Sequence, residues 1–244
     1  MIQRLPDCTQ LLDLKECELM RYIQKSAPPS SLIQVVKNGL QGYEELPNTV
    51  KKDIQRQLLQ DQGGLCAYCM KRIDLNSIQI EHYFPRHPQN PDDAEKGKRL
   101  SLDFKNLLGV CDGGKSMGYD GKNLTCDAHR GNAPLTVNPL NRESIRKIKY
   151  SHDGTIYSDD ESVNHDLNET LNLNSEAANL ARNRKSVLDR FIQSYIMKKY
   201  ANKRITKEEW HHLYEKTQSR DQDGNLLPYV GILEYFIHKK FNTK

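Results

Sequence analysis

Four of the six cysteines gather in the middle of the chain, and they constrain its fold more than any other feature. Cys66 and Cys69 form a Cys-Ala-Tyr-Cys pair, and Cys111 and Cys126 follow downstream. Zinc takes four ligands in tetrahedral geometry, so the first pair alone is incomplete. The segment between the last two cysteines contains four glycines and can loop out while both thiols reach the metal. We therefore expect a structural zinc bound by all four cysteines; a redox pair at Cys66 and Cys69, or unconnected thiols, is the alternative.

The remaining cysteines and the N-terminus indicate the compartment. Cys8 and Cys17 lie far upstream of the cluster, and we expect them to be ordinary reduced thiols. Residues 1–6 lack the apolar region of a secretory signal, and no apolar run approaches the roughly 18 residues of a membrane span. The sequence therefore predicts a soluble, cytoplasmic chain with no membrane partner.

The segments between and after the cysteine pairs predict a small sheet with a helix. Residues 78–82 alternate in polarity like a half-buried strand, and residues 107–110 indicate a second strand. Residues 86–99 are rich in Pro, Asp and Lys, which predicts a loop, and a short helix is expected after Cys126. Two strands and a helix around a metal form the ββα-metal arrangement. The predicted fold class is α+β, with a zinc-stapled ββα-metal core embedded in mostly helical N- and C-terminal regions.

The flanking regions show mostly helical spacing of apolar residues, and we expect three parts: an N-terminal helical segment (1–62), the zinc-bound core (63–140) and a β-hairpin with a helical region (141–244). Thr206 and Glu209 can form a capping box, Asn48 can cap a helix, and Gly63 with Gly64 can end it. A hairpin is predicted between residues 145–150 and 155–157. Helices are predicted over residues 9–24, 48–62, 175 onward, 206–217 and 228–241.

The C-terminal third is basic. Residues 176–244 contain 14 Lys and Arg against 8 Asp and Glu, a local charge of +6, whereas the whole chain carries +4. Such a surface can follow the phosphates of a nucleic acid or contact a protein partner, and a solvated helical surface is the alternative.

Five segments resemble the HNH nuclease superfamily, and more narrowly the PtuB family. They are Gln62-Gly-Gly-Leu-Cys-Ala-Tyr-Cys69, Ile80-Glu-His-Tyr-Phe-Pro85, Leu102-Asp-Phe-Lys-Asn-Leu-Leu108, Leu135-Thr-Val-Asn-Pro-Leu140 and Leu171-Asn-Leu-Asn174. PtuB proteins are HNH components of Septu anti-phage systems and of some retrons, encoded beside an ATPase called PtuA. The resemblance implies an HNH endonuclease of antiviral defence that works with a PtuA-like ATPase. It implies DNA as the default substrate, leaves RNA and tRNA open, and adds a retron reverse transcriptase with its DNA/RNA product as a further partner.

Two residues match the first letters of the HNH pattern. His82, at the end of the first predicted strand, is the expected general base, because a histidine can be neutral near physiological pH and accept a proton from water. The alternative is a structural histidine. Asn106 matches the middle asparagine, whose role is to hold the loop and orient the base through side-chain hydrogen bonds; a turn-forming asparagine is the alternative.

The third letter departs from the pattern, since Asp127 follows the last cysteine where many relatives have His or Asn. A carboxylate suits a hard cation, so we expect Glu81 and Asp127 to bind a catalytic divalent ion, Mg²⁺ or Mn²⁺. His129 completes the catalytic set as a competing third ligand or a phosphate contact, and Asn132 is a weaker candidate. Arg130 would pair with a backbone phosphate.

Two other functions are compatible with these residues. The chain can be a zinc-stabilised nucleic-acid-binding or scaffold protein with a degenerate nuclease site, in which case His82 has no enzymatic role. It can also be a restriction-type nuclease that cleaves without any ATPase. Cleavage by the purified chain, with and without the ATPase, separates all three.

Overall fold

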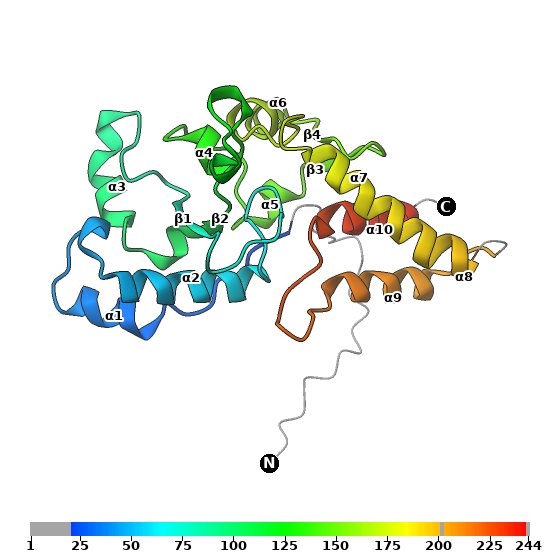
Figure 1. Cartoon of the computed structure of the whole chain (residues 1–244), viewed down its shortest axis with the longest axis horizontal. Helices are drawn as coiled ribbons and strands as arrows, with labels where there is room; N and C mark the ends of the chain where they lie inside the picture. The colour runs from blue at the N-terminus through cyan, green and yellow to red at the C-terminus, as the bar shows by residue number, and fades with distance from the viewer. Residues whose placement is uncertain (1–20, 201–202, 243–244) are drawn as a thin grey trace, which may run out of the picture.

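The computed structural model describes residues 21–200 and 203–242. Cys8, Cys17 and most of the predicted helix over residues 9–24 lie outside the described residues, and residues 21–24 are not helical. Short strands and helices alternate through the described part in a mixed α+β arrangement (Figure 1). Its helices and strands are α1 (Ser30–Lys37), α2 (Asn48–Gln62), β1 (Gln79–His82), α3 (Ala94–Leu100), β2 (Leu107–Val110), α4 (Cys126–Arg130), α5 (Arg142–Ile145), β3 (Ile148–Tyr150), β4 (Ile156–Ser158), α6 (Glu161–His165), α7 (Leu180–Phe191), α8 (Lys198–Tyr200), α9 (Lys207–Gln218) and α10 (Val230–Asn242).

The central sheet has two strands. β1 and β2 pair antiparallel, with His82 opposite Leu107, and α4 follows after a long loop. The predicted order of strand, strand and short helix is confirmed. The prediction of a loop over residues 86–99 is wrong in part, because α3 begins at Ala94. Its acidic first turn and basic last turn complement the helix dipole, a feature that the Pro- and Asp-rich composition of the segment masks.

The long helix α2 ends where the sequence predicts. Gly63 adopts the left-handed conformation (φ 62°), which glycine reaches without steric cost, and its N–H bonds back to the last turn. The start differs from expectation: Pro47 precedes the first helical residue, and Asn48 itself makes no capping hydrogen bond. Pro47 is the N-cap residue, with φ −58° and ψ 144°, and the helix begins without a side-chain cap.

Gln62 joins the end of α2 to β2. Its Nε2 donates to the carbonyls of Leu65 and Gly109, both at 2.7 Å, and its Oε1 accepts from the Gly109 N–H at 2.7 Å. The side chain is buried, so water cannot replace these bonds.

Replacing Gln62 with alanine is expected to lower the stability of the chain by about 2–3 kcal/mol, because the Gly109 N–H and the Leu65 carbonyl lose their bonds to this side chain. For a chain of this size the unfolding midpoint should fall by about 5–10 °C, measured by circular dichroism. Gln60→Ala, at an exposed position on the same helix, is the control and should change the midpoint little. Equal midpoints for the two variants would contradict this assignment.

The C-terminal part is a hairpin followed by packed helices. β3 and β4 form the predicted hairpin, and the predicted capping box of Thr206 and Glu209 begins α9. The helix expected from residue 175 begins only at Leu180, since Asn179 takes a left-handed conformation (φ 51°). The hairpin starts later than expected because residues up to Ile145 form α5. The buried side chains of α7, α9 and α10 form the core of this part: Leu180, Leu188, Phe191, Trp210, Leu213, Ile232, Leu233 and Ile237.

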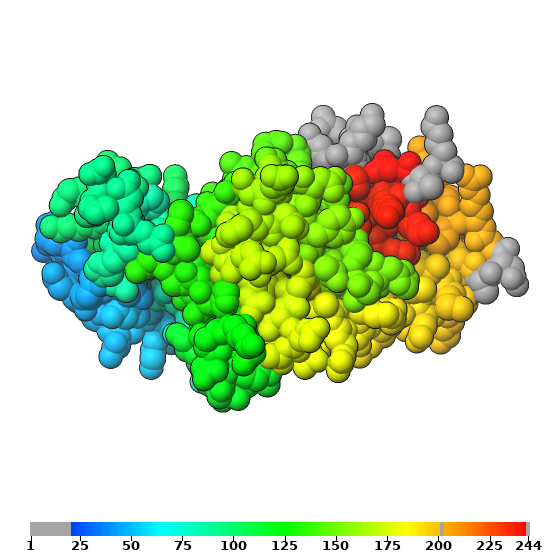
Figure 2. Space-filling model, turned by 90° about the horizontal axis from the view of Figure 1, so that it is seen from above, coloured from blue at the N-terminus to red at the C-terminus, as the bar shows by residue number. Residues whose placement is uncertain are grey.

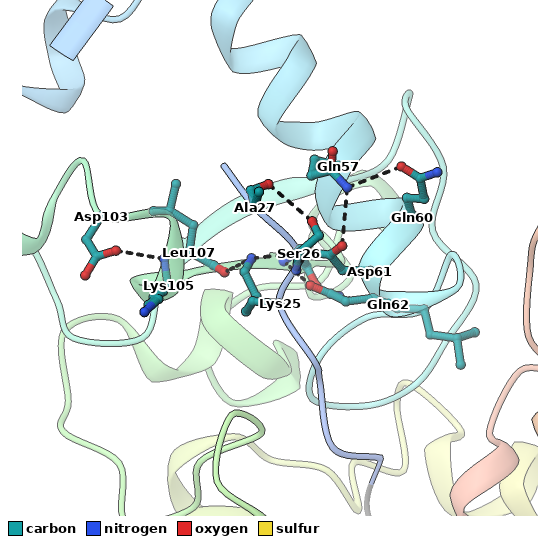
Figure 3. Close-up of polar contacts among 12 residues, drawn as sticks. Lys25, Ser26, Ala27, Gln57, Gln60, Asp61, Gln62, Asp103, Lys105 and Leu107 are labelled. Atoms are coloured by element: carbon teal, nitrogen blue, oxygen red, sulfur yellow. Dashed lines mark hydrogen bonds and ion pairs between the residues drawn. The ribbon is translucent and has the colours of Figure 1, made fainter. Parts of the chain in front are cut away.

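Residues 21–26, here called the strap, run between the central sheet and the C-terminal helices. Arg21 bonds to the buried Glu234 of α10 at 2.9 Å, and the Ile23 N–H bonds to the Pro139 carbonyl at 2.9 Å. Lys25 Nζ donates to the Leu107 carbonyl at 2.9 Å (Figure 3). The same atom lies 3.6 Å from the centre of the Phe104 ring. The strap therefore connects the start of β2 to the last helix.

The molecule is elongated, with α1 and α3 near one end and α9 and α10 towards the other (Figures 1 and 2). Within residues 21–200 and 203–242, no helix has both the length and the apolar composition needed to cross a bilayer. The three-part division at residues 62/63 and 140/141 stays a prediction.

Candidate active site and metal centre

The four predicted cysteine ligands converge on one point. All four Sγ atoms lie within 4.8 Å of one another, and every one of these side chains is buried. The separations are 3.9 Å for Cys66–Cys126, 3.8 Å for Cys69–Cys111 and 3.7 Å for Cys111–Cys126. Metal–sulfur bonds of about 2.3 Å in tetrahedral geometry place sulfur atoms about 3.8 Å apart. The donor set therefore fits a four-coordinate thiolate centre for a structural metal ion.

Backbone hydrogen bonds place these cysteines. A tight knuckle turns from Cys66 to Met70, whose N–H bonds to the Cys66 carbonyl at 3.0 Å, and Met70 takes φ 59° to close it. Cys111 directly follows β2, and Cys126 is the first residue of α4. The knuckle thiols thus contact thiols from the two later segments, which fits one shared metal site better than a separate redox pair.

A buried arginine, Arg184, interacts electrostatically with two thiols of this cluster. Arg184 of α7 donates to the carbonyls of Gly154 and Leu173 and to the Asn174 side chain, and no carboxylate pairs with it in the described part of the chain. Burial lowers its pKa, whereas the nearby thiols, including Cys69 and Cys126, oppose that shift. Four thiolates around a divalent ion would carry a net charge of −2, which the guanidinium of Arg184 would offset in part.

His82 lies at the end of β1 with its ring fixed on two sides. Its Nε2 lies 3.0 Å from the Ser101 carbonyl, which can only accept, so Nε2 carries the proton. The ring of Tyr43 meets it edge to face, at 4.6 Å between centroids. Nδ1 makes no hydrogen bond within the described residues, and its lone pair is therefore the group that can accept a proton.

The protonation of His82 gives a testable pH dependence. Burial lowers its pKa to about 4, and the hydrogen bond to Ser101 offsets only part of that shift. The folded chain thus binds this proton more weakly than the unfolded chain, so stability should fall as the pH drops from about 6.5 towards 4. In an NMR titration the His82 ring, assigned with a His82→Asn variant, should stay neutral at pH 5.5. A midpoint near 6.5 would show that the ring is not held neutral by burial.

Asn106 fastens the loop that follows His82. Its Oδ1 accepts from the Phe84 N–H at 2.7 Å, and its Nδ2 donates to the carbonyls of Phe84 and Leu100 at 3.0 and 3.2 Å. Leu100 precedes Ser101, whose carbonyl holds the histidine. One side chain therefore fixes both the exit of β1 and the segment that orients His82. This is the geometry that the predicted positioning role needs, although the role itself stays a prediction.

Glu81 is engaged by a buried arginine. Its Oε1 pairs with Arg130 Nη1 and accepts from the Tyr68 hydroxyl at 3.1 Å, while Oε2 accepts from the His82 N–H at 2.9 Å. Arg130 also donates to the Tyr83 carbonyl at 2.7 Å, and its side chain is fully buried. The predicted contact between Arg130 and a phosphate is therefore wrong for this structure, because the guanidinium joins α4 to β1 in the interior.

The remaining predicted residues lie on or just after α4. Burial, together with the neighbouring Asp127 carboxylate, raises the pKa of Glu81 to about 8. His129 Nδ1 bonds to the Thr170 carbonyl at 3.0 Å, which leaves its Nε2 as an acceptor. Asn132 is exposed, beyond the end of the helix. Among the described residues only the four cysteines form a cluster of three or more close metal-binding side chains. The structure thus pairs Glu81 with Asp127, and their metal role stays a prediction.

Sequence reasoning missed the groups that hold the site in place. Tyr43 covers His82 from a distant part of the chain, and Ser101 contributes through a backbone carbonyl that any residue could supply. Tyr68 lies inside the first cysteine pair, and the pattern of that pair gives no sign of its bond to Glu81. No local pattern marks these three, because each contact depends on the tertiary fold.

Comparison with known proteins adds a family context. No family model matches the chain. Two curated proteins resemble it. Over 122 residues the chain is 30% identical to "Retron Ec83 putative HNH endonuclease" of Escherichia coli. The match covers 46% of this chain and 46% of that protein, so the chain spans about half the length of this relative. Over 203 residues it is 24% identical to "Retron Vc95 putative HNH endonuclease" of Vibrio cholerae serotype O1 biovar El Tor, covering 82% of this chain and 87% of that one. Both names support the HNH endonuclease resemblance in a retron context.

Proposed function

We propose that the chain is a metal-dependent HNH endonuclease that hydrolyses phosphodiester bonds in nucleic acid. The observation that carries the proposal is the state of His82: a neutral ring, protonated at Nε2 by its bond to Ser101 and left with a lone pair at Nδ1. A general base needs that arrangement to take a proton from an attacking water. The similarity to two proteins named as retron HNH endonucleases supports the same conclusion.

The proposed roles divide between holding the site and doing the chemistry. Zinc in the four-cysteine centre would fix the start of α4 against the end of β2. His82 accepts the proton of the water, and Asn106 keeps the flanking loop in position. Glu81 and Asp127 would hold Mg²⁺ or Mn²⁺, with His129 as a third ligand or a phosphate contact. The ion, when bound, offsets the charge that develops on the scissile phosphate.

The biological setting of the proposal comes from the resemblance to the PtuB family. We propose that the nuclease serves anti-phage defence of the Septu or retron type and works with a PtuA-like ATPase. In a retron, a reverse transcriptase with its DNA/RNA product would be a further partner. DNA is the proposed substrate, and tRNA is the second substrate to offer.

One observation favours a second function, a zinc-stabilised nucleic-acid-binding or scaffold protein with a degenerate nuclease site. Glu81 already has Arg130, Tyr68 and the His82 N–H as partners, so its oxygens are shared before any ion binds. In that case His82 has only a structural role and transfers no proton.

A cleavage assay separates the two functions. The chain would be offered supercoiled DNA and total tRNA with Mg²⁺, Mn²⁺ or EDTA, in the presence and absence of a PtuA-like ATPase. Under the nuclease proposal, cleavage needs the divalent ion and falls by at least about 10²-fold in His82→Ala. His87→Ala is the matched control, because His87 is exposed five positions away, and it should cleave as the unmodified chain does. Metal-bound chain that retains nucleic acid but never cleaves would support the binding function.

A further inference from the structure

A groove of about 1120 Å³ opens at the end of the molecule that carries α9 and α10. It is lined by the segment that leads into α9, by the first turns of that helix and by the last turn of α10. These helices lie far along the long axis from α1 and α3, so the groove is separate from the region of His82 (Figure 1). Its lining residues are Arg204, Ile205, Thr206, Lys207, Trp210, Lys240, Phe241 and Asn242.

The charge of the groove has one sign. Arg204, Lys207 and Lys240 are exposed on its walls, and no acidic residue is among its lining residues. None of the three forms a salt bridge with a carboxylate in the described part of the chain; Lys207 and Lys240 instead lie 5.5 and 5.7 Å from the ring centres of Phe241 and Phe236. Lys207 also interacts electrostatically with Glu208 of the same turn, so the cations outnumber the nearby acid and give a local field that attracts a polyanion.

The wall between these cations is aromatic. Trp210 and Phe241 line the groove, and Trp210 packs edge to face against Phe236 at 6.1 Å between centroids. Cations alone would serve an acidic protein segment equally well. Aromatic rings beside cations are what proteins use for single-stranded nucleic acid, since bases stack on the rings while phosphates contact the cations.

We infer that this groove binds single-stranded nucleic acid, with phosphates at Arg204, Lys207 and Lys240 and a base against Phe241. The inference takes its ligand class from the proposed function but concerns a different surface. A second binding point away from His82 would hold a strand without requiring any cleavage.

The groove contains its own reporter, because Trp210 is the single tryptophan of the chain. The experiment adds a 15-nucleotide oligothymidine to the full chain carrying His82→Ala, in EDTA, and follows the tryptophan fluorescence. Binding of the oligonucleotide in the groove should change the tryptophan emission. The affinity for the oligonucleotide should fall as the salt concentration rises. This readout does not depend on cleavage. A chain that binds the oligonucleotide but cleaves nothing would therefore support the groove inference and contradict only the nuclease proposal.

Charge reversal tests the contacts. Arg204→Glu with Lys240→Glu should weaken binding at least tenfold and reduce the slope of log affinity against log salt by about 1.4, which corresponds to two lost phosphate contacts. Phe241→Ala should weaken binding about tenfold through lost stacking. Lys37→Glu with Lys52→Glu changes the net charge equally at two exposed positions on α1 and α2 and should leave the fluorescence change intact.

Three results would overturn the inference. Oligothymidine could leave the emission unchanged, or the control pair could weaken the response as much as the groove pair. A ten-residue polyglutamate could also displace the oligonucleotide at equal charge and be unaffected by Phe241→Ala, which would make the groove a site for an acidic protein segment. Circular dichroism of each variant verifies that the helices are retained.

Discussion

Replacing Cys111 with serine is expected to abolish binding of the structural metal and to unfold the region around β2 and α4. Cys111 Sγ lies closest to two other thiols, at 3.8 Å from Cys69 and 3.7 Å from Cys126, so its loss opens the centre. Structural zinc contributes about 10–16 kcal/mol in small zinc-finger peptides, which is comparable to the whole stability of a typical domain. Metal content by mass spectrometry should fall from one ion per chain to none, and urea unfolding should lose its cooperative transition.

Cys8→Ser is the matched control, because the sequence places this cysteine outside the cluster. It should keep one metal ion per chain and the unfolding midpoint of the unmodified protein. Cooperative unfolding of Cys111→Ser at an unchanged midpoint would show that the four thiols do not depend on a metal for their arrangement.

Replacing Arg130 with methionine is expected to cost about 2–4 kcal/mol of stability, because the buried side chain of Glu81 loses the donor that pairs with it. The guanidinium also satisfies the carbonyls of Ala133 and Tyr83, which methionine cannot do. Urea unfolding monitored by circular dichroism measures the change. Adding Glu81→Gln to Arg130→Met should recover part of the loss, since the amide oxygen can accept from the His82 N–H while the amide NH2 donates to the Tyr68 hydroxyl oxygen, with no buried charge.

An exposed ion pair supplies the control for this prediction. Arg56 and Asp53 lie 2.8 Å apart with side chains 58% and 41% exposed, so Arg56→Met should change stability by less than about 1 kcal/mol. If Arg130→Met were equally mild, the contact between α4 and β1 would not stabilise the site.

Much of the local structure could be predicted from the sequence, because the signals are short-range. The cysteine spacing identified all four members of the cluster, and strand alternation located β1 and β2. Gly63 and the Thr206 capping box were identified at the helix ends that they occupy. In each case the residues that carry the signal also make the local structure.

The contacts that orient the site could not be predicted, since their partners are far apart in sequence. Gln62 bonds to Gly109, Tyr43 packs on His82, and Arg130 turns inward to Glu81 instead of outward to solvent. A buried arginine and an exposed phosphate-binding arginine look the same in a sequence. Only the packing of α4 against β1 decides between them.

The strap has a consequence for how the chain is made. Arg21 finds its partner Glu234 only after 213 further residues have been synthesised, which takes roughly 10–40 s at 5–20 residues per second. The cysteine cluster and the His82 loop are complete in sequence well before that contact can form. On the ribosome, the middle of the chain can therefore fold while the strap is still detached at one end, and the attachment to α10 is among the last contacts to form.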